Sequence, residues 1–196
     1  MTKYIIPNQG GYRKLKSFQV ARLIYDVTVL FCEKYIDIKS RTRDQMVQAA
    51  RSGVQNIAEG SQASGTSRKF EMKLTNVARA SLEELLLDYE DFLRQRNLSQ
   101  WNPDHPALIE FKRRKPEDLA QVRKWVAWAV NYCDSASCSS VSVNVTPCKS
   151  SEAAANAALS LLNVATYLLD RQLTSQAEKF KIEGGFTERL YHARKR

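Results

Sequence analysis

The sequence predicts an all-α protein, and more specifically an antiparallel, up-and-down four-helix bundle with a long insertion before the last helix. Three observations lead to this fold class. Apolar residues recur at alternating three- and four-residue steps over four stretches, a spacing typical of helices that pack side by side. Short polar segments separate the first three stretches, and a longer, less periodic segment precedes the last. Hydrophobic residues make up 43% of the 196 residues, which is enough for a folded core.

The first helix is predicted to run from about Ser17 to Tyr35. Its main apolar stripe consists of Phe18, Ala21, Tyr25, Thr28, Cys32 and Tyr35. A second stripe beside it consists of Val20, Ile24, Val27 and Phe31. Two adjacent stripes are wider than one contact within the chain needs. We therefore expect the extra face to meet another subunit.

The second helix is predicted to begin at an N-cap, Thr42, with Gln45 completing a capping box, and to end at Gly60. Its inward side chains are predicted to be Met46 or Val47, Ala50, Val54 and Ile57. The third helix is predicted to run from near Ser67 to about Arg96. Its inward side chains are predicted to be Leu74, Val77, Ser81, Leu85, Tyr89 and Phe92. Both helices have the length that a bundle requires.

The periodic spacing of apolar residues becomes weaker after the third helix. Residues 97–106 contain two prolines and predict an extended connection. A modest helix is predicted from Pro116 to about Tyr132, followed by a linker rich in Ser, Cys and Val. The last helix is predicted from Ser151 to about Phe180 and is stopped by Gly184 and Gly185. The chain therefore divides into residues 1–97 with three helices, an insertion at 98–150, and residues 151–196 with the fourth helix.

The net charge of +9 is concentrated near the N-terminus, where residues 1–60 carry ten basic and five acidic side chains. Such a surface attracts polyanions, nucleic acid above all. The alternative is that the excess only aids solubility. No apolar run reaches the roughly 18 residues of a membrane span, and the first residues do not resemble a signal peptide. We therefore expect a cytoplasmic protein with reduced cysteines and no membrane contact.

The sequence offers no assembled catalytic or metal site. The spacing of Cys133, Cys138 and Cys148 does not match the paired ligands of zinc sites. Only two histidines are present, and Cys32 lies on an apolar stripe, so no nucleophile and base can be matched. An acidic cluster on the third helix comprises Glu83, Glu84, Asp88, Glu90 and Asp91. It is interpreted as a solvated face or as a partner for basic groups of a neighbouring subunit. We expect no enzyme activity, no metal and no cofactor.

Basic clusters are the best functional candidates. They flank the starts of the predicted helices and fill the run at residues 112–115. The candidate nucleic-acid-binding residues are Arg13, Lys14, Lys16, Arg41, Arg43, Arg51, Arg68, Lys69, Lys73, Lys112, Arg113, Arg114 and Lys115. In an antiparallel bundle the second and third helices start at opposite ends, so these groups are expected to form two patches or a stripe along the side. Such charges bind phosphates without reading bases.

Four segments together resemble a known family: residues 12–21 (YRKLKSFQVA), 56–61 (NIAEGS), 67–70 (SRKF) and 78–84 (ARASLEE). They are similar to the bacterial four-helix-bundle proteins encoded in 23S rRNA intervening sequences, and to the related Avd accessory protein of diversity-generating retroelements. The resemblance covers residues 12–97. The stretch that ends in Leu190 also resembles a suffix found in a longer branch of the family.

The resemblance implies a homo-oligomer, commonly a pentameric barrel with a basic surface, and for the retroelement branch a complex with a reverse transcriptase and its RNA. The chain departs from the family pattern after residue 97, where about 50 extra residues replace a short turn. The shared NIAEG motif also has a purely structural interpretation, in which Glu59 pairs with Arg79 or Arg68 and Gly60 caps a helix.

These observations lead to two functional hypotheses. The first is a non-catalytic, oligomeric nucleic-acid-binding accessory protein. In its most specific form, this protein is a partner of a retroelement reverse transcriptase and its RNA. The second is a structural or protein-interaction bundle whose basic charge has no role in nucleic-acid binding. A salt-dependent binding measurement separates the two, because contacts with phosphates weaken steeply as salt rises.

Overall fold

The computed structural model describes residues 11–137, 148–184 and 191, and the regular structure in these ranges is entirely helical. The elements are a 3-10 turn η1 (Gly11–Lys14) and the helices α1 (Lys16–Tyr35), α2 (Arg41–Ala63), α3 (Arg68–Gln95), α4 (Pro106–Arg114), α5 (Leu119–Ser137) and α6 (Ser150–Glu183). The all-α class predicted from the sequence is confirmed. The tail beyond Gly184 and the Ser- and Val-rich part of the predicted linker lie outside the described residues, apart from Tyr191.

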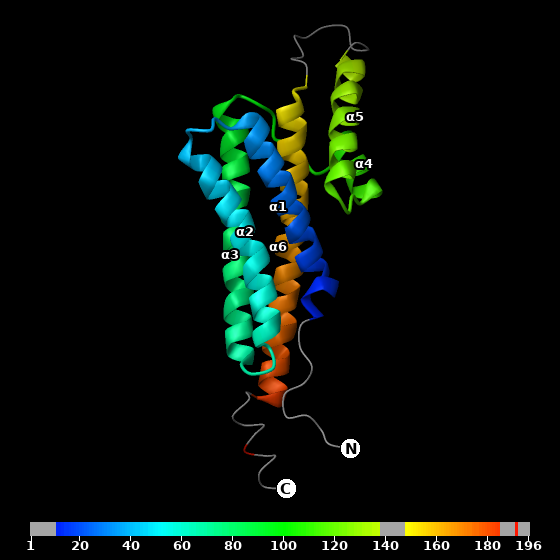
Figure 1. Ribbon diagram of the computed structural model, residues 1–196. Coiled ribbons are helices and arrows are strands. Elements are labelled where there is room, and N and C mark those ends of the chain that lie inside the picture. Colours follow the sequence, from blue (N-terminus) through cyan, green and yellow to red (C-terminus); the bar gives the residue numbers. More distant parts are fainter. Residues whose placement is uncertain (1–10, 138–147, 185–190, 192–196) are drawn as a thin grey trace.

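The four long helices α1, α2, α3 and α6 lie side by side (Figure 1). Helix α1 packs against α2 and α6, and α3 packs against the same two helices. The connections at residues 36–40 and 64–67 are short, so α1, α2 and α3 run in alternating directions. Helices α4 and α5 lie outside this group, where α5 packs against α6 and α1.

Aromatic rings from α1 and α3 fill one part of the core. The ring of Phe31 meets Tyr89 and Phe92 edge-on, with centroid distances of 4.8 and 4.7 Å. Tyr89 is fully buried, and its hydroxyl donates a hydrogen bond of 3.1 Å to Oγ1 of Thr28. The buried phenol is therefore satisfied, and this contact ties α1 to α3 across the interior.

Most of the predicted apolar stripes point into the core, with two differences. The second stripe of α1 was predicted to meet another subunit, but Ile24, Val27 and Phe31 are buried within a single chain. Phe31 packs against Tyr89 and Phe92 of α3 within the chain, whereas Val20, the fourth residue of this stripe, is half-buried and lines an open groove. On α3, Val77 is 38% exposed rather than inward, and its neighbour Ala78 is buried instead.

Both predicted ends of the second helix were wrong. Helix α2 begins at Arg41 after the N-cap Ser40, so Thr42 lies inside the first turn and forms no cap. Gly60 does not end the helix, which continues to Ala63. A Cβ atom at Gly60 would lie 3.3 Å from the Glu71 carbonyl oxygen, so this glycine serves a close approach of α3. The cap of the third helix is close to the prediction, since Ser67 accepts a hydrogen bond from Phe70 N at 3.2 Å.

The insertion contains two helices, where the sequence had predicted one. Helix α4 was missed, and Pro106, which the sequence placed in an extended connection, occupies its first turn. Helix α5 starts at Leu119 and not at Pro116, and the Asp118 carboxylate accepts a hydrogen bond from Gln121 N at 2.8 Å. Trp125 of α5 is 1% exposed and donates to the Ala107 carbonyl of α4 at 3.2 Å, so the two helices share a small core of their own.

Small residues allow α6 to pack on both sides. Its first turns contain four fully buried alanines, Ala153, Ala155, Ala157 and Ala158. Asn156, which is 1% exposed, accepts a hydrogen bond from Trp101 N at 2.8 Å and donates one to the Ser99 carbonyl at 2.9 Å. The connection that leads into the insertion is thereby held against α6. Gly184 ends the helix as predicted, with a φ of 65° and its amide bonded to the Phe180 carbonyl.

Candidate nucleic-acid interface

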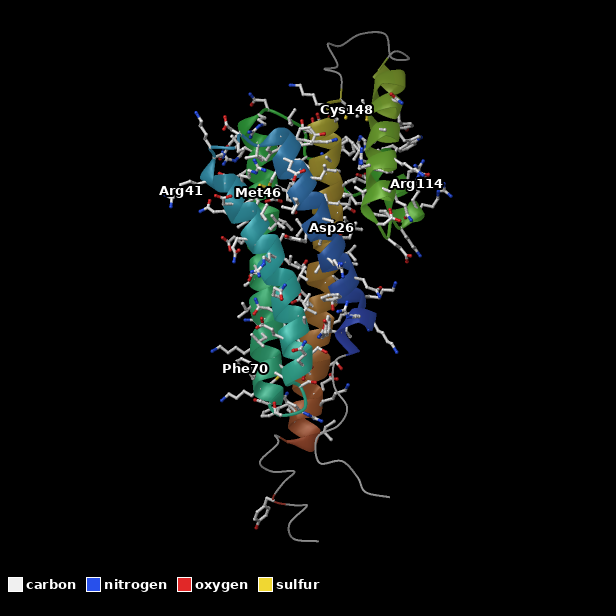
Figure 2. All side chains as sticks on the ribbon, viewed as in Figure 1. Asp26, Arg41, Met46, Phe70, Arg114 and Cys148 are labelled. Atoms are coloured by element: carbon white, nitrogen blue, oxygen red, sulfur yellow. The ribbon has the colours of Figure 1, made fainter. Side chains whose placement is uncertain are left out.

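The basic residues predicted at the helix starts lie at the two ends of the long helices. Arg41 lies near one end and Phe70, which follows Arg68 and Lys69, near the other (Figure 2). The group at the Phe70 end consists of Arg68, Lys69 and Lys73 at the start of α3. Arg13, Lys14 and Lys16 lie in η1 and at the start of α1 instead, where Lys16 pairs with Glu117 at 3.8 Å. The group at the other end consists of Arg41 and Arg43. Arg51 is exposed further along α2, so these candidates do not form one continuous site.

The Phe70-end group lies on the first two turns of α3. All of its side chains are exposed except that of Arg68, which is half-buried and donates a hydrogen bond of 3.0 Å to the Lys179 carbonyl at the end of α6. Arg79, which the structural interpretation of the NIAEG motif had paired with Glu59, instead contacts Asp170 of α6 at 3.4 Å. The basic side chains at this end therefore come from the start of α3, beside the end of α6.

The run of four basic residues at 112–115 is divided between two surfaces. Lys112 and Lys115 line a groove beside α1 and α6, and the ammonium group of Lys112 donates to the Pro103 carbonyl at 2.8 Å. Arg113 and Arg114 instead lie beside Glu110 on another side of α4. Helical geometry causes this division, because residues one or two positions apart face different directions.

Two guanidinium groups share one carboxylate on α4. Arg113 donates two hydrogen bonds of 2.7 Å to Glu110, and Arg114 donates a third of the same length. These bonds from Arg113 and Arg114 hold the pKa of Glu110 at about 2. The carboxylate therefore stays ionised near neutral pH and orients both cations, leaving one excess positive charge for an outside anion.

Aromatic rings continue this basic surface across α5. The guanidinium carbon of Arg114 lies 4.6 Å from the ring centroid of Trp128. The Trp128 ring stacks on Tyr132 with a centroid distance of 5.1 Å and an interplanar angle of 21°. Lys124 lies one turn before Trp128 and Tyr132 one turn after it, which puts all three on one stripe of the helix. We call Arg113, Arg114, Lys124, Trp128 and Tyr132 the basic–aromatic face.

Sequence reasoning missed the α5 part of this face. The sequence predicted a helix over these residues but named none of Lys124, Trp128 and Tyr132 as a binding residue. A signal was present, because Lys124, Trp128 and Tyr132 follow one another at four-residue steps on a helix that buries Val122, Trp125 and Ala129 between residues 119 and 133. Those steps separate an outer stripe from the buried one, and the outer stripe carries aromatic rings beside a cation.

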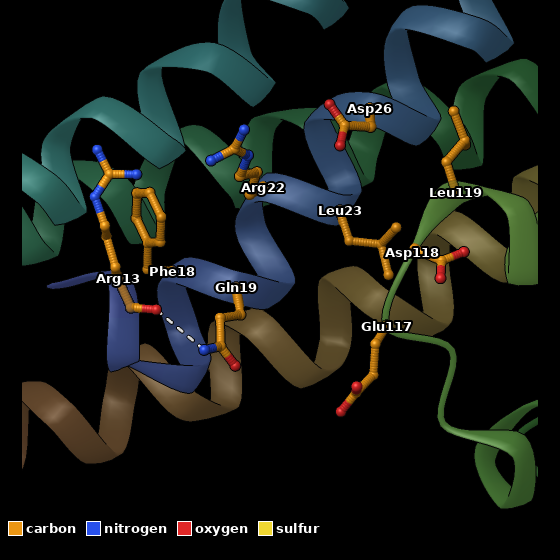
Figure 3. A pocket seen from close by; sticks show the side chains of 9 residues that line it. All are labelled: Arg13, Phe18, Gln19, Arg22, Leu23, Asp26, Glu117, Asp118 and Leu119. Atoms are coloured by element: carbon orange, nitrogen blue, oxygen red, sulfur yellow. Dashed lines mark hydrogen bonds between the residues drawn. The ribbon is translucent and has the colours of Figure 1, made fainter.

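A hollow of about 270 Å³ near the start of α1 has mixed charge (Figure 3). Arg13 and Arg22 line it together with three carboxylates, Asp26, Glu117 and Asp118. The side-chain amide of Gln19 donates a hydrogen bond of 3.0 Å to the Arg13 carbonyl at its edge. Because the charges of both signs nearly balance, this hollow does not favour a polyanion.

Two residue types common in catalytic sites, a cysteine and a histidine, have packing roles here. Burial raises the pKa of the Cys32 thiol to about 11, which leaves it protonated and unreactive. His105 is used structurally, since its Nδ1 accepts a hydrogen bond from Ala107 N at 3.3 Å and its ring stacks on Trp101 at 4.4 Å. Burial lowers the pKa of this imidazole. Within the described ranges no group of three or more His, Cys, Asp or Glu side chains is placed to hold a metal ion; Cys138 and His192 lie outside those ranges.

Among the helices that the structure describes, none combines the length and apolar character needed to cross a membrane. Comparisons with protein-family models, with curated proteins and with solved structures give no match for this chain. The arguments for its function therefore come from its own residues and from the resemblance of residues 12–97 described above.

Proposed function

We propose that this protein is a non-catalytic, oligomeric nucleic-acid-binding accessory protein that holds single-stranded RNA on the basic–aromatic face. One observation supports this best. Arg114, Trp128 and Tyr132 form a row of stacked planar groups beside Arg113 and Lys124, so cations and flat rings alternate on one surface. Single-stranded nucleic acids are bound by that combination, because cations contact the phosphates and rings stack on the bases.

The chemistry of the face favours a single strand over a duplex. Tyr132 is 38% exposed and ends the row, so its ring is open to a further stacking partner. Bases inside a duplex already stack on each other, whereas an unpaired base gains about 1–3 kcal/mol on an aromatic platform. The Phe70-end group of cations would add phosphate contacts that do not depend on sequence.

The resemblance extends this proposal to a biological setting. We assign α1, α2, α3 and α6 to an up-and-down four-helix bundle, which is supported by their ring of contacts and alternating directions. By resemblance, the bundle assembles as a pentamer in the cytoplasm and accompanies a retroelement reverse transcriptase and its RNA. The insertion that carries the basic–aromatic face is this chain's departure from the family pattern, so it is the natural place for a contact specific to this protein.

A titration of fluorescent single-stranded RNA over a series of salt concentrations tests the proposal. Tight binding at low salt should weaken as salt rises, with a slope of about −0.7 per phosphate contacted. Tyr132→Ala should weaken binding by about 1–3 kcal/mol, because a stacking partner is lost. Tyr132→Phe is the matched control and should bind as the wild type does, because the ring is kept.

Duplex RNA of the same length serves as the second control and should bind more weakly at every salt concentration. The proposal fails if RNA does not bind at low salt, or if the salt slope is near zero. If binding is salt-dependent but Tyr132→Ala leaves it unchanged, the basic–aromatic face is not the site.

The second candidate is a protein-interaction bundle without a nucleic-acid role. It is favoured by the groove between α1, α4 and α6, in which Val20, Phe111 and Leu161 are among the lining residues. The same titration separates the two candidates, because a pure interaction bundle would show no salt-dependent RNA binding.

A further inference from the structure

A groove of about 750 Å³ lies between α1, α6 and the end of α4. Its apolar lining comes from all three helices: Val20, Leu23, Phe111, Leu161, Val164 and Leu168. Three lysines, Lys16, Lys112 and Lys115, also line it, against the single carboxylate of Glu117. The groove therefore offers an apolar surface in a positively charged setting.

The groove exists because the insertion covers only part of the surface formed by α1 and α6. Figure 1 shows α4 and α5 beside the N-terminal part of α6, with the C-terminal part left uncovered. Where the cover ends, Val164 of α6 is 44% exposed. Apolar side chains that face an open groove lose the burial that stabilises them elsewhere, at about 25 cal/mol per Å² of apolar surface. A partner that fills the groove would bury this apolar surface and so recover the lost stabilisation.

A matching surface is present on α3. Leu87 is 61% exposed, which is unusual for a leucine in the middle of a long helix. Four carboxylates lie one turn before or after it: Glu83, Glu84, Glu90 and Asp91. We call Leu87 with these four residues the acidic knob.

The acidic knob keeps a negative charge after its own contacts are counted. Asp91 pairs with Arg94 at 2.7 Å, and Glu90 accepts a hydrogen bond from the neutral amide of Gln100 at 2.9 Å. The four carboxylates are thus neutralised by only one guanidinium group among these contacts, that of Arg94. The knob is an apolar side chain in an acidic ring, and the groove is an apolar surface among lysines.

We propose that the groove binds the acidic knob of a second copy of this chain, an inference that rests on the oligomer in the proposed function. Leu87 enters the apolar groove, and carboxylates around it face Lys16, Lys112 and Lys115. Complementary charge speeds such an encounter and selects the orientation, while the buried apolar surface holds it. This contact also explains why Lys112 and Lys115 face away from the basic–aromatic face.

The contact joins two different surfaces, so it is heterologous. The acidic knob lies on α3, which packs against α2 and α6, whereas the groove opens between α1, α4 and α6. Each copy therefore carries one knob and one groove and binds two neighbours. Repetition of such a contact gives a closed ring when the rotation between copies closes, and an open chain when it does not.

The test uses three substitutions that each add one negative charge at an exposed apolar residue. Leu87→Glu damages the knob, and Val164→Glu damages the groove. Ile38→Glu is the matched control, because Ile38 is 78% exposed in the connection between α1 and α2. Circular dichroism checks that each variant is folded, and sedimentation velocity measures association of the full chain.

Each damaged variant alone should raise the dissociation constant for self-association by at least about tenfold, which corresponds to 1.4 kcal/mol. Ile38→Glu should associate as the wild type does. An equimolar mixture of Leu87→Glu and Val164→Glu should give a dimer that neither forms alone, because one copy keeps its knob and the other its groove. Assembly stops at two copies, since the remaining knob and groove are both damaged.

Three results would overturn the inference: a wild-type chain that stays monomeric, damaged variants that still associate, or a mixture without the dimer. A monomeric wild type would leave an acidic segment of another protein as the groove's occupant. RNA binding is measured on the same variants, whose substitutions lie outside the basic–aromatic face. Assembly without RNA binding would reject the proposed function alone, and RNA binding without this contact would reject the inference alone.

Discussion

Asp88 on α3 is a half-buried carboxylate in an unfavourable place. Its Oδ2 atom is buried without a hydrogen-bond partner among the described residues. Burial raises the pKa of this group, and the like charges of Glu84 and Asp91 raise it further. The ionised carboxylate of Asp88 is therefore less favourable in the folded chain than in the unfolded one, and this lowers the stability of the fold.

We predict that Asp88→Asn stabilises the protein at neutral pH by roughly 0.5–1 kcal/mol, the size of two like-charge contacts one turn apart on a helix. The folded pKa is raised, so the cost of Asp88 is present above that pKa. It disappears as the pH falls through the raised value toward 3.8, the ordinary value of an aspartate. Urea denaturation of both chains at several pH values measures the difference, which should shrink on acidification.

Asp91→Asn is the matched control for this prediction. Asp91 lies on the same helix, but its carboxylate is exposed and pairs with Arg94 at 2.7 Å. Its removal should bring no stabilisation. A gain for Asp91→Asn equal to that for Asp88→Asn would mean that net helix charge, and not the buried site, sets the effect.

The contact between α2 and α3 depends on small residues. At Gly53, an added Cβ atom would lie 2.6 and 2.9 Å from Cδ2 and Cγ of Leu82, which is fully buried. At Gly60 the closest atoms belong to Glu71 and Leu74, at 3.3 Å. Glycine is unfavourable inside a helix, so its presence twice in α2 is explained by the close approach of α3.

We predict that Gly53→Ala destabilises the protein by about 1 kcal/mol. Alanine gains about 1 kcal/mol of helix propensity, but overpacking against Leu82 costs about 1–3 kcal/mol. A double-mutant cycle measured by urea denaturation tests the cause. In the Leu82→Ala background the clash is absent, so Gly53→Ala should there be neutral or stabilising. The same loss in both backgrounds would contradict the steric explanation.

The helices were predictable from sequence where the apolar spacing is long and regular. In α6, Leu159, Leu162 and Leu169 follow one another at steps of three and seven residues, and all three are buried. Helix ends were less predictable, because a single residue type has several uses. Gly60 was interpreted as a cap, since glycine commonly ends helices, but here it permits a close contact that only the packed structure reveals. Helix α4 escaped detection because nine residues are too few for a periodic pattern.

The surfaces of the whole molecule were less predictable than its helices. Sequence reasoning placed Lys112 and Arg114 in one basic run, and folding sends them to the groove and the basic–aromatic face. That face forms only when α4 docks beside α5, and no local sequence pattern predicts this docking. The second stripe of α1 likewise predicted a subunit contact, because the residues of α3 that pack against Phe31 lie far away in the sequence.

Docking of the insertion onto α6 depends on one amide side chain. Asn156 is 1% exposed and bonds to Trp101 N and the Ser99 carbonyl in the connection that follows α3. Trp101 also donates from its ring nitrogen to Glu152 at 3.1 Å. These bonds hold the start of the insertion against the helix that resumes after it.

We predict that Asn156→Leu weakens this attachment by roughly 1–3 kcal/mol, because it leaves a backbone donor and a backbone acceptor without their partner. Hydrogen exchange should become faster in α4, α5 and the connection before them, while amides in α2 and α3 keep their rates. Asn163→Leu is the matched control, since the Asn163 side chain is exposed and, among the described residues, donates to the Leu159 carbonyl of its own helix at 2.9 Å. Equal acceleration in α2 and α3 would show that the insertion and the long helices unfold as one unit.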